Sequence, residues 1–194
     1  RYRNKENDCF IRKIKNAEHG WLWIRSSGLS SLWRRRQLKE SRVKLELPKI
    51  DRSDYRFAIV HSKFNFDLTD DLLENCCSEF IKLGISIDSI KKWAVPGALE
   101  IPLVANLLAK EKSYGVILGI GCVIRGETSH FDIVVRESAA GLSRVSMDFK
   151  IPCINGIIAA ESYEQARERC SSKGKDFACS SVYMADLMER IKDG

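Results

Sequence analysis

The residues best suited to chemistry gather in one stretch, Arg125 to His130, directly after a short apolar run. That run, Gly115 to Ile120, is typical of a buried parallel strand. Ligands of open parallel α/β sheets bind just beyond the carboxyl ends of the strands. Backbone N–H groups at Gly126 to Thr128, where the loop enters the next helix, suit an anion. His130 can exchange a proton near neutral pH, so the stretch predicts an anion site beside an acid–base residue.

Three other strand ends are expected at the same edge of the sheet. They supply an aromatic ring at Phe64, a carboxylate at Glu100 and a polar turn that begins at Asn155. Arg169, on a later helix, could reach a phosphate from this subunit or from a neighbour. We interpret His61, also at a strand end, as a packing residue.

Each candidate also has a purely structural interpretation. His130 could cap a helix, and the negative charge of Glu100 could stabilise the amino end of a helix by interacting with the helix dipole. Phe64 could lie in the core, and Arg169 could be a solvated helix charge. The glycines at 121 and 126 are not followed by Lys-Ser/Thr, so they do not form a nucleotide P-loop. No residue in isolation decides the function.

Strands and helices alternate four times, which predicts an α/β fold with a parallel sheet covered on both faces. The alternating and apolar runs predict strands at 56–60, 89–95, 116–120 and 152–158. Apolar residues at helical spacing predict a first helix that starts near Thr69 and further helices at 99–110 and 131–148. They also predict two final helices at 163–170 and 177–191, separated by Lys173-Gly174.

The first quarter of the chain differs from the rest in charge. Residues 1–50 hold 14 Lys and Arg residues and 5 Asp and Glu residues. Residues 51–194 hold the remaining 18 of the chain's 32 Lys and Arg residues and 21 of its 26 Asp and Glu residues. The mildly acidic remainder argues against nucleic acid as its partner. We expect residues 1–42 to be a poorly ordered basic extension and 43–194 to be the folded domain, with a strand at 43–47; a membrane-binding or nucleic-acid-binding segment and a targeting peptide are the alternatives for 1–42.

The cysteines and apolar runs bear on the compartment. The chain has seven cysteines and no C-x-x-C pair, which favours a reducing cytoplasm over a secreted disulfide framework and argues against a structural zinc site. No apolar run approaches the ~20 residues of a membrane span.

Two longer motifs resemble those of a known family. VPGALEIP at 95–102 and GCVIRGETSHF at 121–131 are similar to the corresponding motifs of 6,7-dimethyl-8-ribityllumazine synthases. Glu164-Gln165-Ala166, Arg169 and Lys173-Gly174 also fit, and the resemblance runs in order over residues 54–192. It implies a three-layer, flavodoxin-like α/β domain with a four-stranded parallel sheet of order 2-1-3-4.

The resemblance also implies a reaction. Lumazine synthases condense 5-amino-6-(D-ribitylamino)uracil with 3,4-dihydroxy-2-butanone 4-phosphate and release phosphate and water, with no metal or organic cofactor. His130 would transfer protons. The butanone phosphate would bind to Glu127, Thr128 and Arg169. The pyrimidine would bind to Phe64, Ala98, Leu99, Glu100, Cys122, Val123, Ile124 and Asn155.

Family members are pentamers, or capsids made of pentamers, with each active site between subunits, and the resemblance implies a homo-oligomer here. We expect Phe64 and Asn155 to come from one subunit and His130, Glu127, Thr128 and Arg169 to come from the next. Most members carry an aromatic residue where this chain has Asn155, and a carboxamide stacks poorly on a ring.

Two other hypotheses compete with the enzyme. One is a flavodoxin-like protein that holds a lumazine or flavin without turnover, and the other is a structural cage protein with a basic arm. A passive flavin pocket needs neither a phosphate clamp nor a proton shuttle, so His130, Glu127, Thr128 and Arg169 together favour the enzyme.

Overall fold

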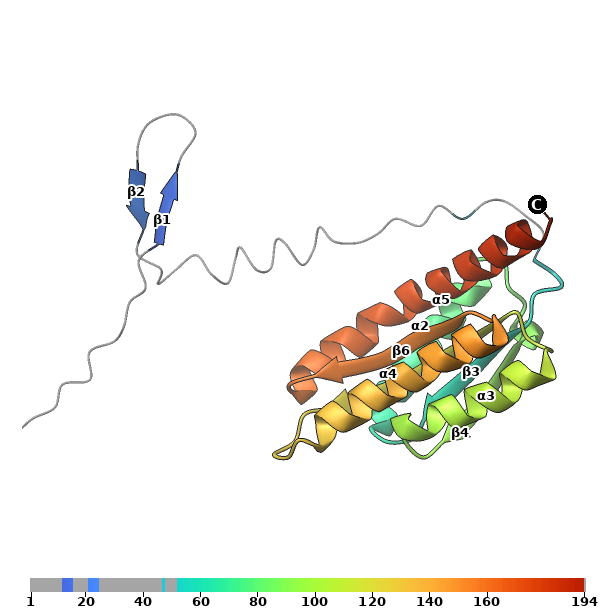
Figure 1. The fold of residues 1–194 in the computed structure, drawn as a ribbon, viewed down its shortest axis with the longest axis horizontal. Coiled ribbons are helices and arrows are strands. Elements are labelled where there is room, and N and C mark those ends of the chain that lie inside the picture. The colour runs from blue at the N-terminus through green and yellow to red at the C-terminus, as the bar shows by residue number, and fades with distance from the viewer. Residues whose placement is uncertain (1–11, 16–20, 25–46, 48–51, 194) are drawn as a thin grey trace, which may run out of the picture. The chain divides into compact units, whose positions relative to one another are not determined.

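The computed structural model describes residues 12–15, 21–24, 47 and 52–193 (Figure 1). The chain divides into two units, residues 1–44 and 45–194. In the first unit, β1 (Arg12–Lys15) pairs antiparallel with β2 (Trp21–Ile24). The expected disorder of residues 1–42 falls outside the described residues except for this hairpin, and so does the strand expected at 43–47, of which only Leu47 is described.

The second unit is built on four parallel strands. They are β3 (Phe57–Ser62), β4 (Ile90–Val95), β5 (Val116–Ile124) and β6 (Cys153–Ala160). Their order in the sheet is β4-β3-β5-β6, and every pairing is parallel. The predicted order 2-1-3-4 is confirmed.

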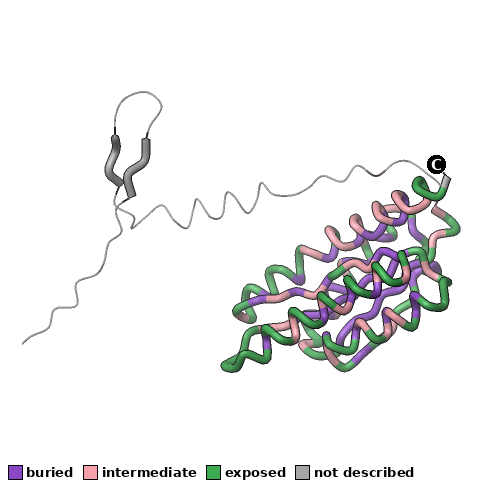
Figure 2. The backbone as a smooth tube through the Cα atoms, in the orientation of Figure 1, coloured by how far each residue is buried: buried purple, intermediate pink, exposed green. Residues whose placement is uncertain are grey.

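Helices cover both faces of this sheet (Figure 1). One core cluster joins α2 (Phe66–Lys82) and α5 (Tyr163–Asp193) to one face. The other joins α3 (Ile101–Glu111) and α4 (His130–Phe149) to the opposite face. Short 3-10 turns lie at Ile87–Ser89 and Ala98–Glu100. The central strands β3 and β5 are largely buried between these layers, whereas the edge strands β4 and β6 carry exposed residues, and the other exposed residues lie on the helices and loops (Figure 2).

β5 is longer than predicted, because the glycines within it do not end the strand. A Cβ added to Gly119 would lie 2.8 Å from Ile101 Cγ2 and 2.9 Å from Leu142 Cδ1, so glycine is needed where α3 and α4 press on the sheet. The strand therefore continues through residues 121–124, which carries these predicted loop residues onto its carboxyl end. β6 likewise runs two residues past the predicted end.

The predicted start of the first helix at Thr69 is wrong. α2 begins at Phe66, after Asn65 adopts a left-handed conformation with φ 56° and ψ 49°. Thr69 lies buried in the first turn, where its hydroxyl contacts the carbonyl oxygens of Asn65 and Phe66 at 3.3 and 3.2 Å. Thr69 thus satisfies backbone acceptors inside the helix and does not cap it.

The predicted break at Lys173-Gly174 is also wrong, because α5 is one continuous helix. A Cβ added to Gly174 would lie 2.8 Å from Asn75 Cβ and Cys76 N, and 2.9 Å from the carbonyl oxygen of Leu72. Gly174 is therefore the point where α5 and α2 approach most tightly. Its lack of a side chain serves packing between the helices.

Candidate active site

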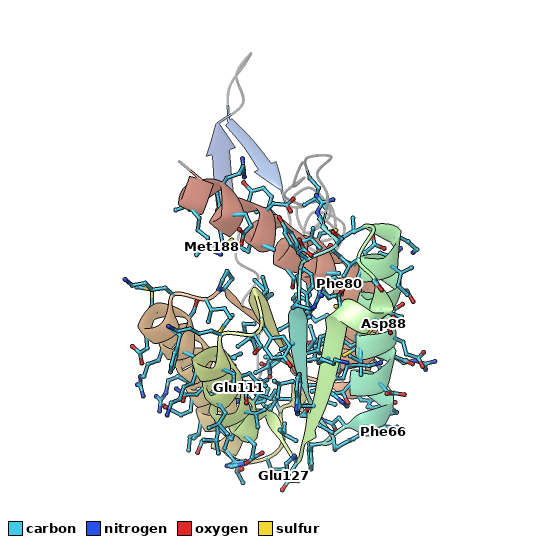
Figure 3. All side chains as sticks on the ribbon, turned by 90° about the vertical axis from the view of Figure 1, so that its right-hand side faces the viewer. Phe66, Phe80, Asp88, Glu111, Glu127 and Met188 are labelled. Atoms are coloured by element: carbon cyan, nitrogen blue, oxygen red, sulfur yellow. The ribbon has the colours of Figure 1, made fainter. Side chains whose placement is uncertain are left out.

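A cavity of about 380 Å³ opens at the carboxyl end of the sheet. Phe66 and Glu127 mark this end of the domain, and Met188 lies toward the opposite end (Figure 3). The predicted residues that line the cavity are Phe64, Ala98, Leu99, Glu100, Cys122, Val123, Ile124, Thr128 and His130. The remaining lining residues, Gly97, Gly126, Phe131 and Val134, come from the same turns and from α4. Three segments that are separate in sequence, at residues 64, 97–100 and 122–134, thus meet in one pocket.

The backbone after β3 holds Phe64 at the cavity. The N–H groups of Lys63 and Phe64 donate to the carbonyl oxygens of Val95 and Pro96 at 2.8 and 2.9 Å, which extends the β3–β4 pairing beyond the strands. Asn65 then turns the chain and donates from Nδ2 to the carbonyl oxygen of Cys122 at 2.9 Å. Phe64 is left 71% exposed, so the interpretation of Phe64 as a core residue is wrong.

Glu100 is fixed at the cavity rim by the turn that precedes it. Its Oε2 accepts a hydrogen bond from the N–H of Gly97 at 2.8 Å, which caps the 3-10 turn. The cap orients a carboxylate that is exposed and also lines the cavity. Glu100 therefore stabilises the turn and presents a hydrogen-bond acceptor at the same time.

The loop before α4 presents the amino end of that helix to the cavity. Ser129, at the N-cap position, makes no side-chain cap hydrogen bond. Thr128 Oγ1 accepts from the N–H of His130 at 3.4 Å, and a Cβ added to Gly126 would meet no described atom within 4 Å. An open helix N-terminus carries a partial positive charge and attracts anions. His130 is the first residue of α4, is exposed and lines the same cavity.

An ion-pair network, which sequence reasoning missed, anchors this loop. The guanidinium of Arg125 donates to both carboxylate oxygens of Asp132, at 3.0 and 2.8 Å, and to Glu161 at 2.7 Å. It also lies 4.1 Å from the ring centroid of Phe131. Hydrogen bonding to Arg125 lowers the pKa of Asp132, and these carboxylates raise the pKa of Arg125. The opposite charges at 125 and 132, flanking a loop and a first helical turn, were the signal available in the sequence.

Two predicted residues do not line this cavity. Asn155 lies on the edge strand β6, where it pairs with Gly119 of β5. The cavity residue Cys122 pairs with Ile158, so Asn155 lies three residues, or about 10 Å along the strand, away from the level of the cavity. It is exposed, and its Oδ1 accepts from the N–H of Ile157 at 3.0 Å. Arg169 is exposed on α5, which covers the sheet face opposite α4. Within one chain, Arg169 fits the description of a solvated helix charge.

The predicted division of residues between subunits also differs from the geometry of the single chain. We expected Phe64 and His130 to come from different subunits, but both line one cavity of the same chain. Glu127 lies between the lining residues Gly126 and Thr128 and is exposed without lining the cavity itself. The residues that a neighbour could add are therefore Asn155 and Arg169.

His61 behaves as the sequence indicated. It is 8% exposed on β3, and burial, followed by the charge of Lys63, lowers its pKa. A neutral imidazole in this position packs in the sheet and takes no part in the cavity. The interpretation of His61 as a packing residue is confirmed.

Two further observations concern the residues that the structure describes. No group of three or more His, Cys, Asp or Glu residues among them could hold a metal ion. Within the same residues, no helix combines the length and the apolar character needed to cross a membrane.

The chain is similar to known proteins over most of this domain. The model of the family described as 6,7-dimethyl-8-ribityllumazine synthase matches residues 54–189. The 6,7-dimethyl-8-ribityllumazine synthase of Leptothrix cholodnii is 43% identical over 143 residues, which cover 74% of this chain and 93% of that protein. The synthase of Verminephrobacter eiseniae is 40% identical with the same coverage. That of Methylibium petroleiphilum is 43% identical over 136 residues, which cover 70% and 85%. The cavity and these similarities agree, and the chain belongs to the 6,7-dimethyl-8-ribityllumazine synthase family.

Proposed function

We propose that the cavity lined by Phe64, Glu100 and His130 is where this chain performs the lumazine synthase reaction. In that reaction, 5-amino-6-(D-ribitylamino)uracil condenses with 3,4-dihydroxy-2-butanone 4-phosphate to give 6,7-dimethyl-8-ribityllumazine, phosphate and water. The observation that carries the proposal is the meeting of an exposed aromatic ring, an imidazole and an open helix N-terminus in one cavity.

The pyrimidine binds at the end of the cavity formed by Phe64 and β5. The exposed ring of Phe64 offers a flat apolar surface on which a pyrimidine can stack. The lining residues Cys122, Val123 and Ile124 lie at the end of β5 and present backbone groups to the edge of the ring. The ribityl hydroxyl groups bind along Ala98-Leu99-Glu100, where the oriented Glu100 carboxylate accepts hydrogen bonds.

The phosphate of the second substrate binds at the amino end of α4. The N–H groups of Glu127 and Thr128 and the partial charge of the helix stabilise the dianion. Arg125 is engaged by two carboxylates, so it is not a free phosphate ligand. We assign the compensating cation to Arg169 of a neighbouring subunit, because Arg169 of the same chain does not line the cavity.

His130 moves the protons of the reaction. The amine at ring position 5 attacks the ketone and loses water to form an imine, and proton transfers then eliminate phosphate and leave a carbonyl group. The ribitylamino nitrogen attacks this carbonyl, and loss of a second water closes the second ring. A positioned imidazole typically contributes 10²–10⁴-fold to such steps. Alignment of the two bound substrates supplies much of the remaining acceleration. The reaction needs no metal or organic cofactor.

The active form is a homo-oligomer, a pentamer or a capsid made of pentamers. Leu99, Leu103 and Leu107 recur every four residues along the 3-10 turn and α3 and are 40%, 64% and 54% exposed. A row of exposed leucines on one helix face is typical of a surface that a partner covers. We infer that a neighbour packed against these leucines brings its own Asn155 and Arg169 to the cavity. This arrangement replaces the division of residues that the sequence suggested.

The proposed reaction uses small molecules and takes place in the cytoplasm, with neither nucleic acid nor membrane as partner. The six described cysteines are free thiols, which is compatible with a reducing compartment.

A direct assay separates the enzyme from a passive lumazine-binding or flavin-binding protein. The protein is mixed with both substrates, and lumazine absorbance and phosphate release are followed together. We expect turnover in the wild type. The His130→Ala variant should lose 10²-fold or more in kcat while it still binds the pyrimidine. Binding of lumazine without phosphate release would favour the passive protein, and an unchanged rate in His130→Ala would remove His130 from its role.

A further inference from the structure

The side chain of Arg125 contacts carboxylates that lie 7 and 36 residues further along the chain. It lies in the loop after β5, and its guanidinium donates to Asp132 in the first turn of α4 and to Glu161 just beyond β6. The backbone N–H of Arg125 also donates to the carbonyl oxygen of Ala160 at 2.9 Å. Arg125 is thus tied to the edge strand through both its backbone and its side chain.

These contacts enclose the loop that the proposed function assigns to phosphate. Arg125 lies immediately before Gly126, and Asp132 lies two residues after His130. The bidentate pair between Arg125 and Asp132 therefore closes a short ring of chain around residues 126–131. The one side-chain hydrogen bond that the described residues show inside this ring is the 3.4 Å contact from the His130 N–H to Thr128. The Arg125–Asp132 pair is thus the main side-chain contact that the described residues show across this loop.

The same guanidinium also acts on the cavity wall. It stacks 4.1 Å from the ring centroid of Phe131, which lines the cavity next to His130. A planar guanidinium held by two carboxylates and an aromatic face has little freedom left. Two carboxylates also more than balance its single positive charge, so Arg125 adds no net attraction for a dianion.

We propose that Arg125, held by Asp132 and Glu161, is a positioning residue that sets the amides of residues 126–128 and the ring of His130 for the butanone phosphate. This inference rests on the proposed function of the cavity. Arg125 acts through the loop and does not touch the phosphate. Its fork geometry is required, because the single nitrogen of a lysine ammonium does not reproduce the bidentate pair with Asp132 together with the separate donation from Nε to Glu161.

The test removes one carboxylate at a time. In Asp132→Asn and Glu161→Gln, we measure kcat and the KM of each substrate, and the affinity for inorganic phosphate by calorimetry. A displacement of about 1 Å can cost up to 10²-fold. We therefore expect the KM of the butanone phosphate to rise about tenfold or more in Asp132→Asn, with the KM of the pyrimidine within about twofold. Arg125→Lys should show the same split.

The control is Glu137→Gln, which removes an exposed carboxylate of α4 that pairs only with its neighbour Arg136 among the described ion pairs. It should leave both KM values unchanged. Unchanged KM values in Asp132→Asn and Glu161→Gln, or an equal rise for both substrates, would overturn the inference. A wild type without turnover would instead refute the proposed function, and the phosphate affinities of the wild type and Asp132→Asn would still decide the role of Arg125.

Discussion

Replacing Gly174 with alanine should destabilise the domain, although the same change would stabilise an ordinary helix. Gly174 lies inside α5, where alanine has a helix propensity about 1 kcal/mol more favourable than glycine. If Gly174 lay on an open surface of this helix, Gly174→Ala would raise stability. The close approach of α2 predicts the opposite sign.

The magnitude follows from the distances. The new methyl group would lie 2.8 Å from Asn75 Cβ and Cys76 N and 2.9 Å from the carbonyl oxygen of Leu72. Ordinary contacts begin at 3.4 Å, so the two helices must separate by several tenths of an ångström. All three atoms are fixed to the backbone of α2, and no rotamer change relieves them. Overpacking of this kind costs typically 1–3 kcal/mol, and the upper end applies here. After the propensity gain, we expect a net loss of about 2 kcal/mol.

This loss is measured by thermal unfolding followed by circular dichroism. The protein concentration is kept fixed, because the protein is proposed to be oligomeric and its Tm would then depend on concentration. About 2 kcal/mol corresponds to a Tm lower by roughly 4–8 °C for a domain of this size. Lys175→Ala is the matched control, since Lys175 is the exposed next residue of the same helix, and its Tm should change by less than about 2 °C. An unchanged or higher Tm in Gly174→Ala would refute the reasoning from close helix packing.

Two further predictions concern the buried ion pair between Arg52 and Asp186. Arg52 donates to Asp186 at 3.1 and 2.7 Å, and the Asp186 side chain is 0% exposed. Asp186→Ala should therefore lower the free energy of unfolding, measured by urea titration, by about 3–5 kcal/mol. A loss below about 1 kcal/mol would contradict a buried pair. Burial and then Asp186 raise the pKa of Tyr55 from 10.0 to about 12, so the folded state binds this proton more tightly than the unfolded state. The free energy of unfolding should therefore fall as the pH rises from about 10 to 12. Over that range, the Tm of Tyr55→Phe should change less with pH than the Tm of the wild type. Parallel Tm profiles would show that Tyr55 does not contribute to this pH dependence.

Local patterns in the sequence were enough for the sheet and for most of the cavity. β3 and β5 are short apolar runs, β4 and β6 carry enough apolar residues to be recognised beside them, and the strand order makes the loops after β3, β4 and β5 converge at one edge. Phe64, Glu100, Thr128 and His130 were accordingly predicted and line the cavity together.

The features that could not be predicted from the sequence depend on contacts between segments that are distant along the chain. Glycine is a common signal for a turn, yet Gly119 and Gly174 lie inside a strand and a helix because neighbouring elements press on them. The role of Arg125 depends on Glu161, 36 residues away, which no local spacing could indicate. Asn155 and Arg169 do not line the cavity of a single chain, so the role proposed for them needs a second copy, whose position no local pattern in the sequence could indicate.

Leu99 belongs both to the cavity wall and to the row of exposed leucines that continues along α3. Its exposure has a practical consequence for any mutational test of the proposed oligomer. A charged residue at 99 would reshape the substrate cavity as well as the contact surface, so a loss of activity could not be assigned to dissociation. Leu103 and Leu107 do not line the cavity, and charge introduced there would test whether a lone subunit can turn over substrate.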